Sequence, residues 1–324
     1  MLSVFNKGMP STVTVPQAHN LARSFSLWGR GSKKPSDGRK RKNRHHHPRR
    51  RRGDCWDEIT TEEKGGPLGS LEYRMYFKSR SRPGEYISPW HSIPIFPGVS
   101  PSGDEPIRIS RDESQYVVHM VCEVPRFTRH KMMISRTEPF NPIMQERVRS
   151  KQTGKLVPRY IKYSPMIYNY GAVPQTWADA NTAEGGDNNP LDIIEISSLP
   201  ARIGEVKKVR ILGALPLIDS DEINWKLVGV DASAHEARGM RDLTDVERFM
   251  PGVVNRIREW FRVYKVAEGM PSNKYGFDNK NVNCEYTMRI INESHESWKS
   301  LSYSKRHKTM MPKESSEIAK TLLV

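Results

Sequence analysis

The chain has 324 residues, a formal charge of +15 and a hydrophobic content of 36%. It is long enough to bury a sizeable core, and it has no apolar run of the length that a transmembrane helix needs. The three cysteines, Cys55, Cys122 and Cys284, are far apart and form no C-x-x-C pair, which argues against a disulfide framework or a structural zinc site and favours a reducing compartment.

The positive charge is concentrated near the N-terminus. Residues 1–53 hold 14 Lys and Arg against the single acid Asp37, so the rest of the chain is close to neutral. Residues 1–31 contain Lys7, Arg23 and Arg30, several Ser and Thr, and no acid, which is typical of a mitochondrial targeting presequence. We therefore expect a location in the mitochondrial matrix, with the nucleus as the alternative.

Residues 32–66 are expected to form a disordered basic arm, because such a charged run cannot bury apolar surface. Its clustered bases are Arg39, Lys40, Arg41, Lys42, Arg49, Arg50, Arg51 and Arg52. The arm fits three functions: contact with RNA through phosphate neutralisation, nuclear localisation, or an extended transit peptide. We favour contact with RNA, and we interpret His45-His46-His47 as a solvated part of the run, since no acid or cysteine completes a metal site there.

Residues 67–302 are expected to form the globular domain, followed by a polar tail at 303–324. Alternating residues from Leu71 to Trp90 predict a strand pair that turns at Arg82-Pro83-Gly84. Further strands are predicted at 116–124, 191–196, 206–217 and 225–230. One helix should begin near Thr244, where Thr244 and Glu247 match a capping box, and continue to Phe261; a second should span 285–301. These patterns predict an α+β class that is mainly β.

Residues 186–192, Gly-Asp-Asn-Asn-Pro-Leu-Asp, are the most informative segment. By itself this segment indicates a turn that leads into a half-buried strand. Its neighbours add specificity: the ordered segments are 122–128, 141–143, 169–177, 204–213, 219–226, 259–265 and 295–299. Together, from about Leu71 to Leu301, they closely resemble the soluble inorganic pyrophosphatases of the eukaryotic type. The resemblance implies a small closed, OB-like barrel of mostly antiparallel strands with flanking helices, and it suggests a homodimer.

The resemblance also assigns residues to the site where that family binds Mg²⁺ and hydrolyses diphosphate. Hard oxygen ligands suit Mg²⁺, and the family's metal ligands are matched by Asp187, Asp192, Asp219 and Glu222. Glu123 also fits the family pattern. The family's phosphate-binding residues are matched by Lys131, Tyr170, Lys226, Tyr264 and Lys265.

Other positions depart from the family. Asn189 stands where the resemblance implies the general base, and an amide cannot accept a proton from water at neutral pH. Asn224 and Met133 stand where metal-binding acids are expected, and Met270 replaces a lysine. Met166 replaces a phosphate-binding Tyr, and the alignment leaves open whether Arg159 replaces a phosphate-binding Arg. Binding of Mg²⁺ is therefore expected to be weak or absent.

These losses favour a pyrophosphatase-like protein that is catalytically inactive or severely impaired. With its basic arm, such a protein would act as a structural, RNA-binding or protein-binding component of a mitochondrial ribonucleoprotein, such as the ribosome or an assembly intermediate. The alternative is an active, Mg²⁺-dependent mitochondrial pyrophosphatase that uses Asp187, Asp192, Asp219 and Lys226. No membrane partner is expected.

Overall fold

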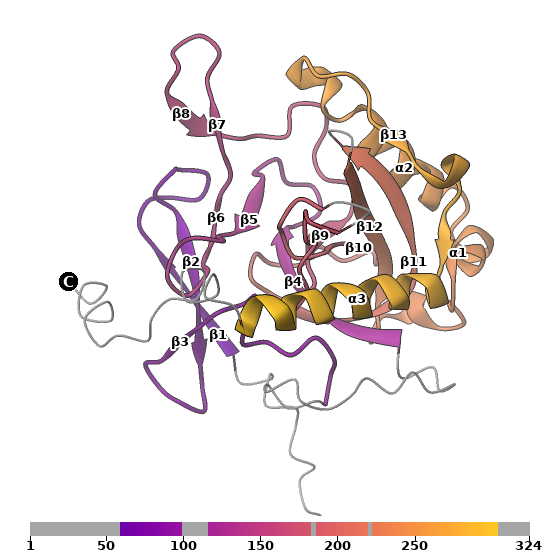
Figure 1. The fold of residues 1–324 in the computed structure, drawn as a ribbon, viewed down its shortest axis with the longest axis horizontal. Coiled ribbons are helices and arrows are strands. Elements are labelled where there is room, and N and C mark those ends of the chain that lie inside the picture. Colours follow the sequence, from indigo (N-terminus) through magenta and orange to yellow (C-terminus); the bar gives the residue numbers. More distant parts are fainter. Residues whose placement is uncertain (1–58, 99–115, 183–185, 220–221, 304–324) are drawn as a thin grey trace, which may run out of the picture. The chain divides into compact units, whose positions relative to one another are not determined.

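Five strands of the computed structural model pair around a ring (Figure 1). The model describes residues 59–98, 116–182, 186–219 and 222–303. The ring is formed by β4 (Val117–Val124), β9 (Asn169–Ala172), β10 (Asp192–Glu195), β12 (Glu222–Asp231) and β11 (Val206–Asp219), which pairs with both β4 and β12. Only the pairing of β10 with β12 is parallel. The α+β, mainly β class predicted from the sequence is confirmed.

Neighbouring residues in the ring strands pack into different parts of the core, because successive side chains of a strand point to opposite faces. In β10, Ile194 belongs to a hydrophobic cluster that includes Trp260, whereas Ile193 belongs to a second cluster that includes Ile291. Both isoleucines are fully buried. The near-continuous apolar runs of the ring strands follow from this burial on two faces.

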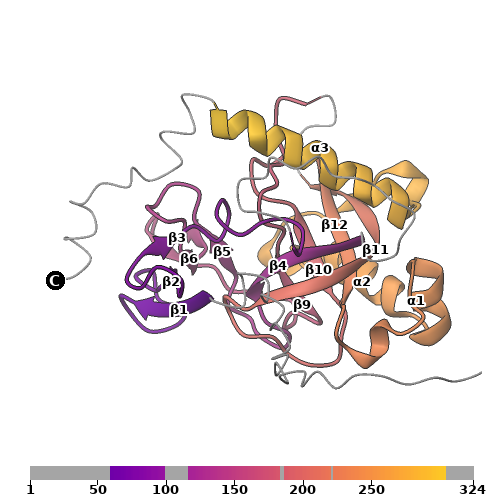
Figure 2. The same ribbon diagram turned by 90° about the horizontal axis from the view of Figure 1, so that it is seen from below.

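A second sheet lies beside the ring in both views (Figures 1 and 2). Its strands pair in the order β1 (Ile59–Lys64), β2 (Arg74–Ser79), β6 (Ile143–Gln145), β5 (Met132–Ile134), and β3 (Tyr86–Ile87) pairs with β2. The predicted strand pair between 71 and 90 is thus present as β2 and β3. In contrast, β1 falls inside the segment predicted to be a disordered arm: its six residues, three of them β-branched, pair along the whole length of β2.

A two-stranded hairpin of β7 (Arg147–Arg149) and β8 (Leu156–Pro158) pairs with no other strand among the described residues and projects from the domain (Figure 1). Short strands β13 (Lys274–Tyr275) and β14 (Val282–Asn283) extend the ring sheet at β11. Three 3-10 turns, η3 (His235–Ala237), η4 (Val266–Glu268) and η5 (Phe277–Asn279), lie within the helical C-terminal part.

The helix predicted from Thr244 to Phe261 is in fact two helices, α1 (Leu243–Phe249) and α2 (Val253–Val263). Pro251 and Gly252, which has a φ of 79°, separate them. The capping-box prediction is wrong: Asp242 is the N-cap of α1 and accepts from the amides of Thr244 and Asp245. Glu247 instead accepts from the amides that begin α2.

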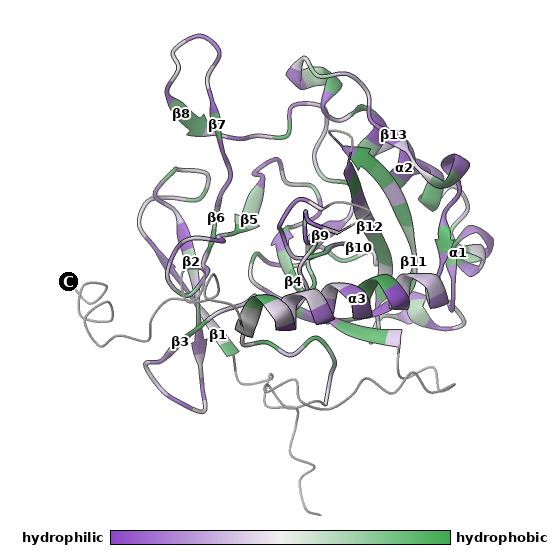
Figure 3. Cartoon of the chain, in the orientation of Figure 1, coloured by the Kyte–Doolittle hydropathy of each residue, from purple (hydrophilic) through white to green (hydrophobic). Residues whose placement is uncertain are grey.

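Helix α3 (Cys284–Tyr303) confirms the predicted C-terminal helix and packs against β11. It carries hydrophobic and hydrophilic residues along its length (Figure 3), and Met288, Ile291 and Trp298 are buried. Among the described residues, no helix is both long and apolar enough to cross a membrane.

Candidate functional site

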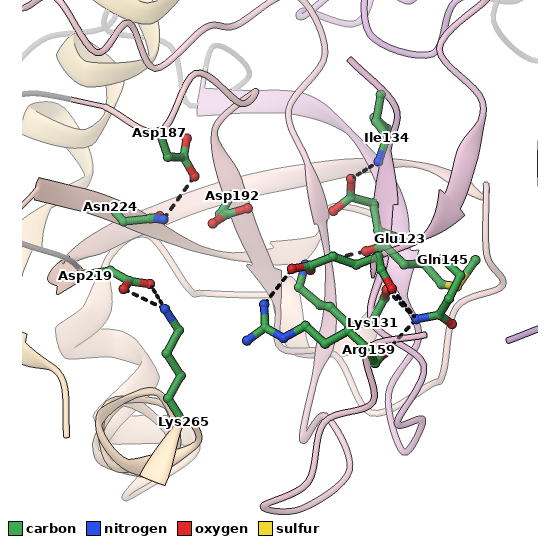
Figure 4. A network of polar contacts seen from close by, with 12 residues as sticks. Glu123, Lys131, Ile134, Gln145, Arg159, Asp187, Asp192, Asp219, Asn224 and Lys265 are labelled. Carbon is green, nitrogen blue, oxygen red and sulfur yellow. Dashed lines mark hydrogen bonds and ion pairs between the residues drawn. The ribbon is translucent and has the colours of Figure 1, made fainter. Parts of the chain in front are cut away.

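A polar cavity of about 450 Å³ lies where the ring meets the second sheet and the end of α2. Its charged and amide residues come from β4, the segments that flank β5, the region from β6 to just after β8, the 187–192 loop, the β11–β12 hairpin and the segment after α2 (Figure 4). The lining includes Glu123, Lys131, Met133, Arg136, Glu146, Arg147, Arg159, Tyr170, Asp187, Asn189, Asp192, Asp219, Asn224, Lys226, Tyr264 and Lys265. These residues are distant in sequence, so the fold creates the cavity.

Both carboxylate oxygens of Asp187 accept hydrogen bonds, one from its own loop and one from β12. Its Oδ1 accepts from the amide of Asn189 at 3.0 Å, which closes a turn two residues on. Its Oδ2 accepts from Nδ2 of Asn224 at 3.1 Å, across to β12 (Figure 4). Asn188 takes the left-handed conformation that this turn requires, with a φ of 59°. The amide at 224 therefore gives Asp187 a protein partner where the family pattern would place a second acid.

Asp192 and Lys226 face each other because β10 and β12 are parallel and in register at these two residues. Lys226 Nζ donates to Asp192 Oδ2 and also to Oδ1 of Asn224. The ammonium group lies 5.9 Å from the ring centre of Tyr170 and 5.7 Å from that of Phe261. Since Lys226 is only 4% exposed, this ion pair is largely withdrawn from water.

Asp219 is paired in the same way with a base. Lys265 Nζ, which follows α2, donates to both carboxylate oxygens of Asp219, at 2.6 and 2.5 Å (Figure 4). All three aspartates retained from the family pattern thus contact an amide or ammonium group of the protein.

Glu123 differs from these aspartates because burial raises its pKa to about 7, although nearby Lys131 opposes the shift. The side chain is 5% exposed, and its Oε1 accepts from the amide of Ile134 at 2.7 Å. Lys131 lies 4.8 Å from the ring centre of Tyr170. Near neutral pH, Glu123 is therefore only partly ionised.

The side-chain oxygen of Asn189 is buried without a hydrogen-bond donor in the described part of the chain. The backbone carbonyl of Asn189 accepts from Ala178 at 2.9 Å, which fixes the loop. Met133 also lines the cavity. An amide and a thioether thus line the cavity at the two positions where the resemblance implied acids, and that part of the interpretation stays a prediction.

Two arginines that line the cavity were not assigned to it from the sequence: Arg136 was missed, and the role of Arg159 was left undecided. Arg136 donates to the carbonyls of Asp187 and Asn188, at 3.2 and 3.4 Å. Arg159 pairs with Glu146 at 2.6 Å and Glu268 at 3.1 Å. The lining contains six bases against five acids, a formal excess of one positive charge. The position of Arg136 shortly after β5 was the only available signal, and it was not specific.

Glu222 does not line this cavity, and its assignment as a metal ligand stays a prediction. Glu222 is exposed and lies two residues before Asn224, at the end of the β11–β12 hairpin beyond the lining. Met270 is 47% exposed and Met166 is buried in the hydrophobic core, so neither lines the cavity. The basic-arm residues between Arg39 and Arg52 lie outside the described residues.

Comparison with known proteins identifies the family of this chain. The model of the family "Inorganic pyrophosphatase" matches residues 120–299, more than half of the chain. The chain belongs to the inorganic pyrophosphatase family. A mouse member, inorganic pyrophosphatase 2, mitochondrial, is 40% identical over 253 residues, which cover 76% of this chain and 74% of that protein. Another, from Kluyveromyces lactis, is 36% identical and covers 74% and 79%.

Solved inorganic pyrophosphatase structures have the same fold. A pyrophosphatase of T. brucei brucei superimposes with a TM-score of 0.68 at 35% identity, covering 78% of this chain and 72% of that chain. A truncated vacuolar soluble pyrophosphatase of Trypanosoma cruzi, solved in complex with PPi, gives 0.65 at 36% identity and covers 76% and 92%.

The inorganic pyrophosphatase family uses Mg²⁺, so the donor set of this cavity has to be tested against that ion. Mg²⁺ prefers several carboxylate and water oxygens in octahedral geometry. Here Asn189, Asn224 and Met133 line the cavity with two amides and a thioether, and Asp187, Asp192 and Asp219 already contact protein nitrogens. Among the described residues, no three His, Cys, Asp or Glu side chains converge closely enough to hold a metal ion. The arrangement does not fit the family's magnesium site.

Proposed function

We propose that this protein binds diphosphate or a chemically similar anion in the cavity and hydrolyses it only weakly. The observation that carries the proposal is the charge of the lining: Asn189, Asn224 and Met133 stand at acid positions, and six bases exceed five acids. Three acids at these positions would make the same lining negative. A cavity with an excess of bases can attract a multivalent anion without a metal ion to neutralise it.

Lys131, Lys226 and Lys265 are the groups best placed to contact the anion. Lys226 and Lys265 are paired with Asp192 and Asp219, so an entering phosphate would share or take over these ammonium groups. Within the part of the chain that the structure describes, Arg136 donates only to carbonyl oxygens, and its guanidinium can bind two phosphate oxygens in a bidentate manner.

The same residues explain why hydrolysis should be weak. Attack by water requires a group that takes up its proton, and the amide of Asn189 cannot do so. Glu123 does not replace it, because that carboxyl is buried and accepts from the Ile134 amide. We also propose that Mg²⁺ binds weakly or not at all, since the carboxylates that remain have protein partners.

Two measurements on the full chain test this proposal. Calorimetry with diphosphate in EDTA should show binding, and Lys131→Gln with Lys265→Gln should abolish it, whereas the exposed control Lys280→Gln should not. A phosphate-release assay with Mg²⁺ or Mn²⁺ should give turnover lower than that of the mouse mitochondrial relative by a factor on the order of 10²–10⁴, the range for loss of a general base. Turnover equal to that of the relative would refute weak hydrolysis.

A second candidate function is ordinary Mg²⁺-dependent hydrolysis of diphosphate. Relatives that are 36–40% identical over about three quarters of the chain are named inorganic pyrophosphatases, and this favours the second candidate. Asp187, Asp192, Asp219 and Lys226 would supply the site. Under this candidate, metal binding by the unmodified protein would be tight, so calorimetry with Mg²⁺ separates the two functions independently of turnover.

For location, we propose mitochondria. The presequence-like residues 1–31 and the mitochondrial relative support this. We further propose that the basic residues from Arg39 to Arg52 bind RNA of a mitochondrial ribonucleoprotein. Affinity purification from mitochondria tests both ideas: co-purification of ribosomal proteins and RNA is expected, and a nuclear or purely cytosolic signal would overturn the location.

A further inference from the structure

The β7–β8 hairpin carries a positive charge that the proposed function does not use. Residues 147–158 include Arg147, Arg149, Lys151 and Lys155, and no acid. All four side chains are exposed. Within the described ranges, none of the four forms an ion pair. Unpaired cations that are held close together repel each other, so this hairpin is suited to an anionic ligand.

The hairpin is a fixed structure at its base and its turn. At the base, Arg159 pairs with Glu146 at 2.6 Å, and the Arg159 amide donates to the Glu146 carbonyl at 2.8 Å. At the turn, the Ser150 amide donates to the Lys155 carbonyl at 2.9 Å, and Gly154 takes the left-handed conformation, with a φ of 68°. The cations are therefore displayed on an ordered element, which lowers the entropy lost on binding.

The cations continue from the cavity outward. Arg147 lines the cavity, and Arg149 lies on the same face of β7 about 7 Å further along. Lys151 Nζ lies 3.8 Å from the position that a Cβ atom would take on Gly269, just after η4. Lys265, which pairs with Asp219 inside the cavity, is four residues before Gly269. Positive charge thus continues from Arg147 in the cavity lining along β7 to Lys151, which lies beside Gly269.

We propose that the hairpin extends the anion site outward, so that the protein prefers linear inorganic polyphosphates of three or more phosphates over diphosphate. This inference rests on the proposed function, because the end of the chain would occupy the cavity. Polyphosphate is favoured over RNA, because residues 147–158 contain no aromatic side chain on which a base could stack. A flexible chain of phosphates needs only the spaced cations that Arg147, Arg149 and Lys151 supply.

The test measures the Kd of diphosphate, tripolyphosphate and a longer polyphosphate by calorimetry on the full chain in EDTA. The test variant combines Arg149→Gln, Lys151→Gln and Lys155→Gln, none of which lines the cavity. The control variant removes the same charge elsewhere through Arg202→Gln, Arg238→Gln and Lys280→Gln, which are equally exposed. In the unmodified protein, the longer polyphosphate should bind at least about tenfold more tightly than diphosphate, which corresponds to ~1.4 kcal/mol.

The hairpin variant should lose this preference and bind diphosphate as the unmodified protein does, whereas the control should keep it. Equal affinity of the unmodified protein for all three ligands, or equal losses in both variants, would overturn the hairpin's role while leaving diphosphate binding intact. Failure of diphosphate to bind at all would overturn the proposed function and this inference together. A loss of RNA affinity in the hairpin variant as large as its loss of polyphosphate affinity would show that the hairpin is a general polyanion surface and would also overturn the inference.

Discussion

Nδ2 of Asn224 donates to Oδ2 of Asp187 over 3.1 Å and joins β12 to the loop before β10. Two carboxylates at this distance would repel each other unless a cation lay between them. The amide removes that repulsion and converts the contact into an internal hydrogen bond. This hydrogen bond occupies one oxygen of Asp187 with a protein donor.

Restoring the acids should recover magnesium binding. The triple variant Met133→Glu, Asn189→Asp, Asn224→Asp places three carboxylates back in the lining. We expect calorimetry to detect Mg²⁺ and phosphate release to rise by a factor on the order of 10²–10⁴, because a general base is regained. Asn181→Asp with Asn279→Asp adds two carboxylates outside the cavity and shows the effect of negative charge alone. If the triple variant were no more active than the unmodified protein, the missing acids would not be the cause of weak hydrolysis.

Removing Lys226 should destabilise the domain. Lys226→Met leaves Asp192 without its ammonium partner in a largely buried position, and breaking one side of such a pair costs roughly 3 kcal/mol. Combining it with Asp192→Asn should recover most of the loss, as measured by urea unfolding. Lys299→Met, which removes an exposed pair with Glu296, should cost less than about 1 kcal/mol. Equal costs for the two single variants would contradict the assigned burial of the Lys226 pair.

Glu123 should make stability depend on pH. Its pKa of about 7 in the fold exceeds the ordinary value of 4.5, so the folded state binds the proton more tightly. Its contribution to stability is complete below about pH 4.5 and is lost as the pH rises through 7. Relative to Glu123→Gln, the unmodified protein should lose roughly 3 kcal/mol between pH 4.5 and 8. Urea midpoints across this range give the difference.

The matched control for that experiment is Glu72→Gln, an exposed carboxylate remote from the cavity. Its difference from the unmodified protein should stay constant over the same pH range. A constant difference for Glu123→Gln as well would show that burial does not raise the pKa of Glu123.

The start of α1 can be tested at two neighbouring residues. Asp242→Ala removes the acceptor of the Thr244 and Asp245 amides and should cost about 1 kcal/mol in the free energy of unfolding. Thr244→Ala removes only a hydroxyl that donates to Asp242 and should cost less. The reverse order would favour the capping box with Thr244 that the sequence suggested.

The basic arm can be tested by truncation. Deleting residues 31–53 removes 11 of the chain's Lys and Arg residues. We expect weaker RNA binding and a shallower dependence of log Kd on log salt, because fewer counterions are released. Binding that is unchanged at every salt concentration would limit this segment to a targeting role.

The sequence by itself determined the family, the main strands and the final helix. Ordered segments from Cys122 to Lys299 identify the fold, and apolar runs such as Val206 to Leu217 mark strands because burial on two faces demands them. It also determined that positions 189, 224 and 133 carry two amides and a thioether, since chemical type is read directly from the residue.

Only the tertiary structure decided which charges meet. The parallel register of β10 and β12 sets Lys226 against Asp192, 34 residues away, and the path after α2 brings Lys265 to Asp219. Arg136 reaches the 187–192 loop, and Glu222 falls outside the cavity. Local patterns cannot supply such pairings, because the charge of a pocket is a sum over strands whose register is fixed by packing far from the pocket itself.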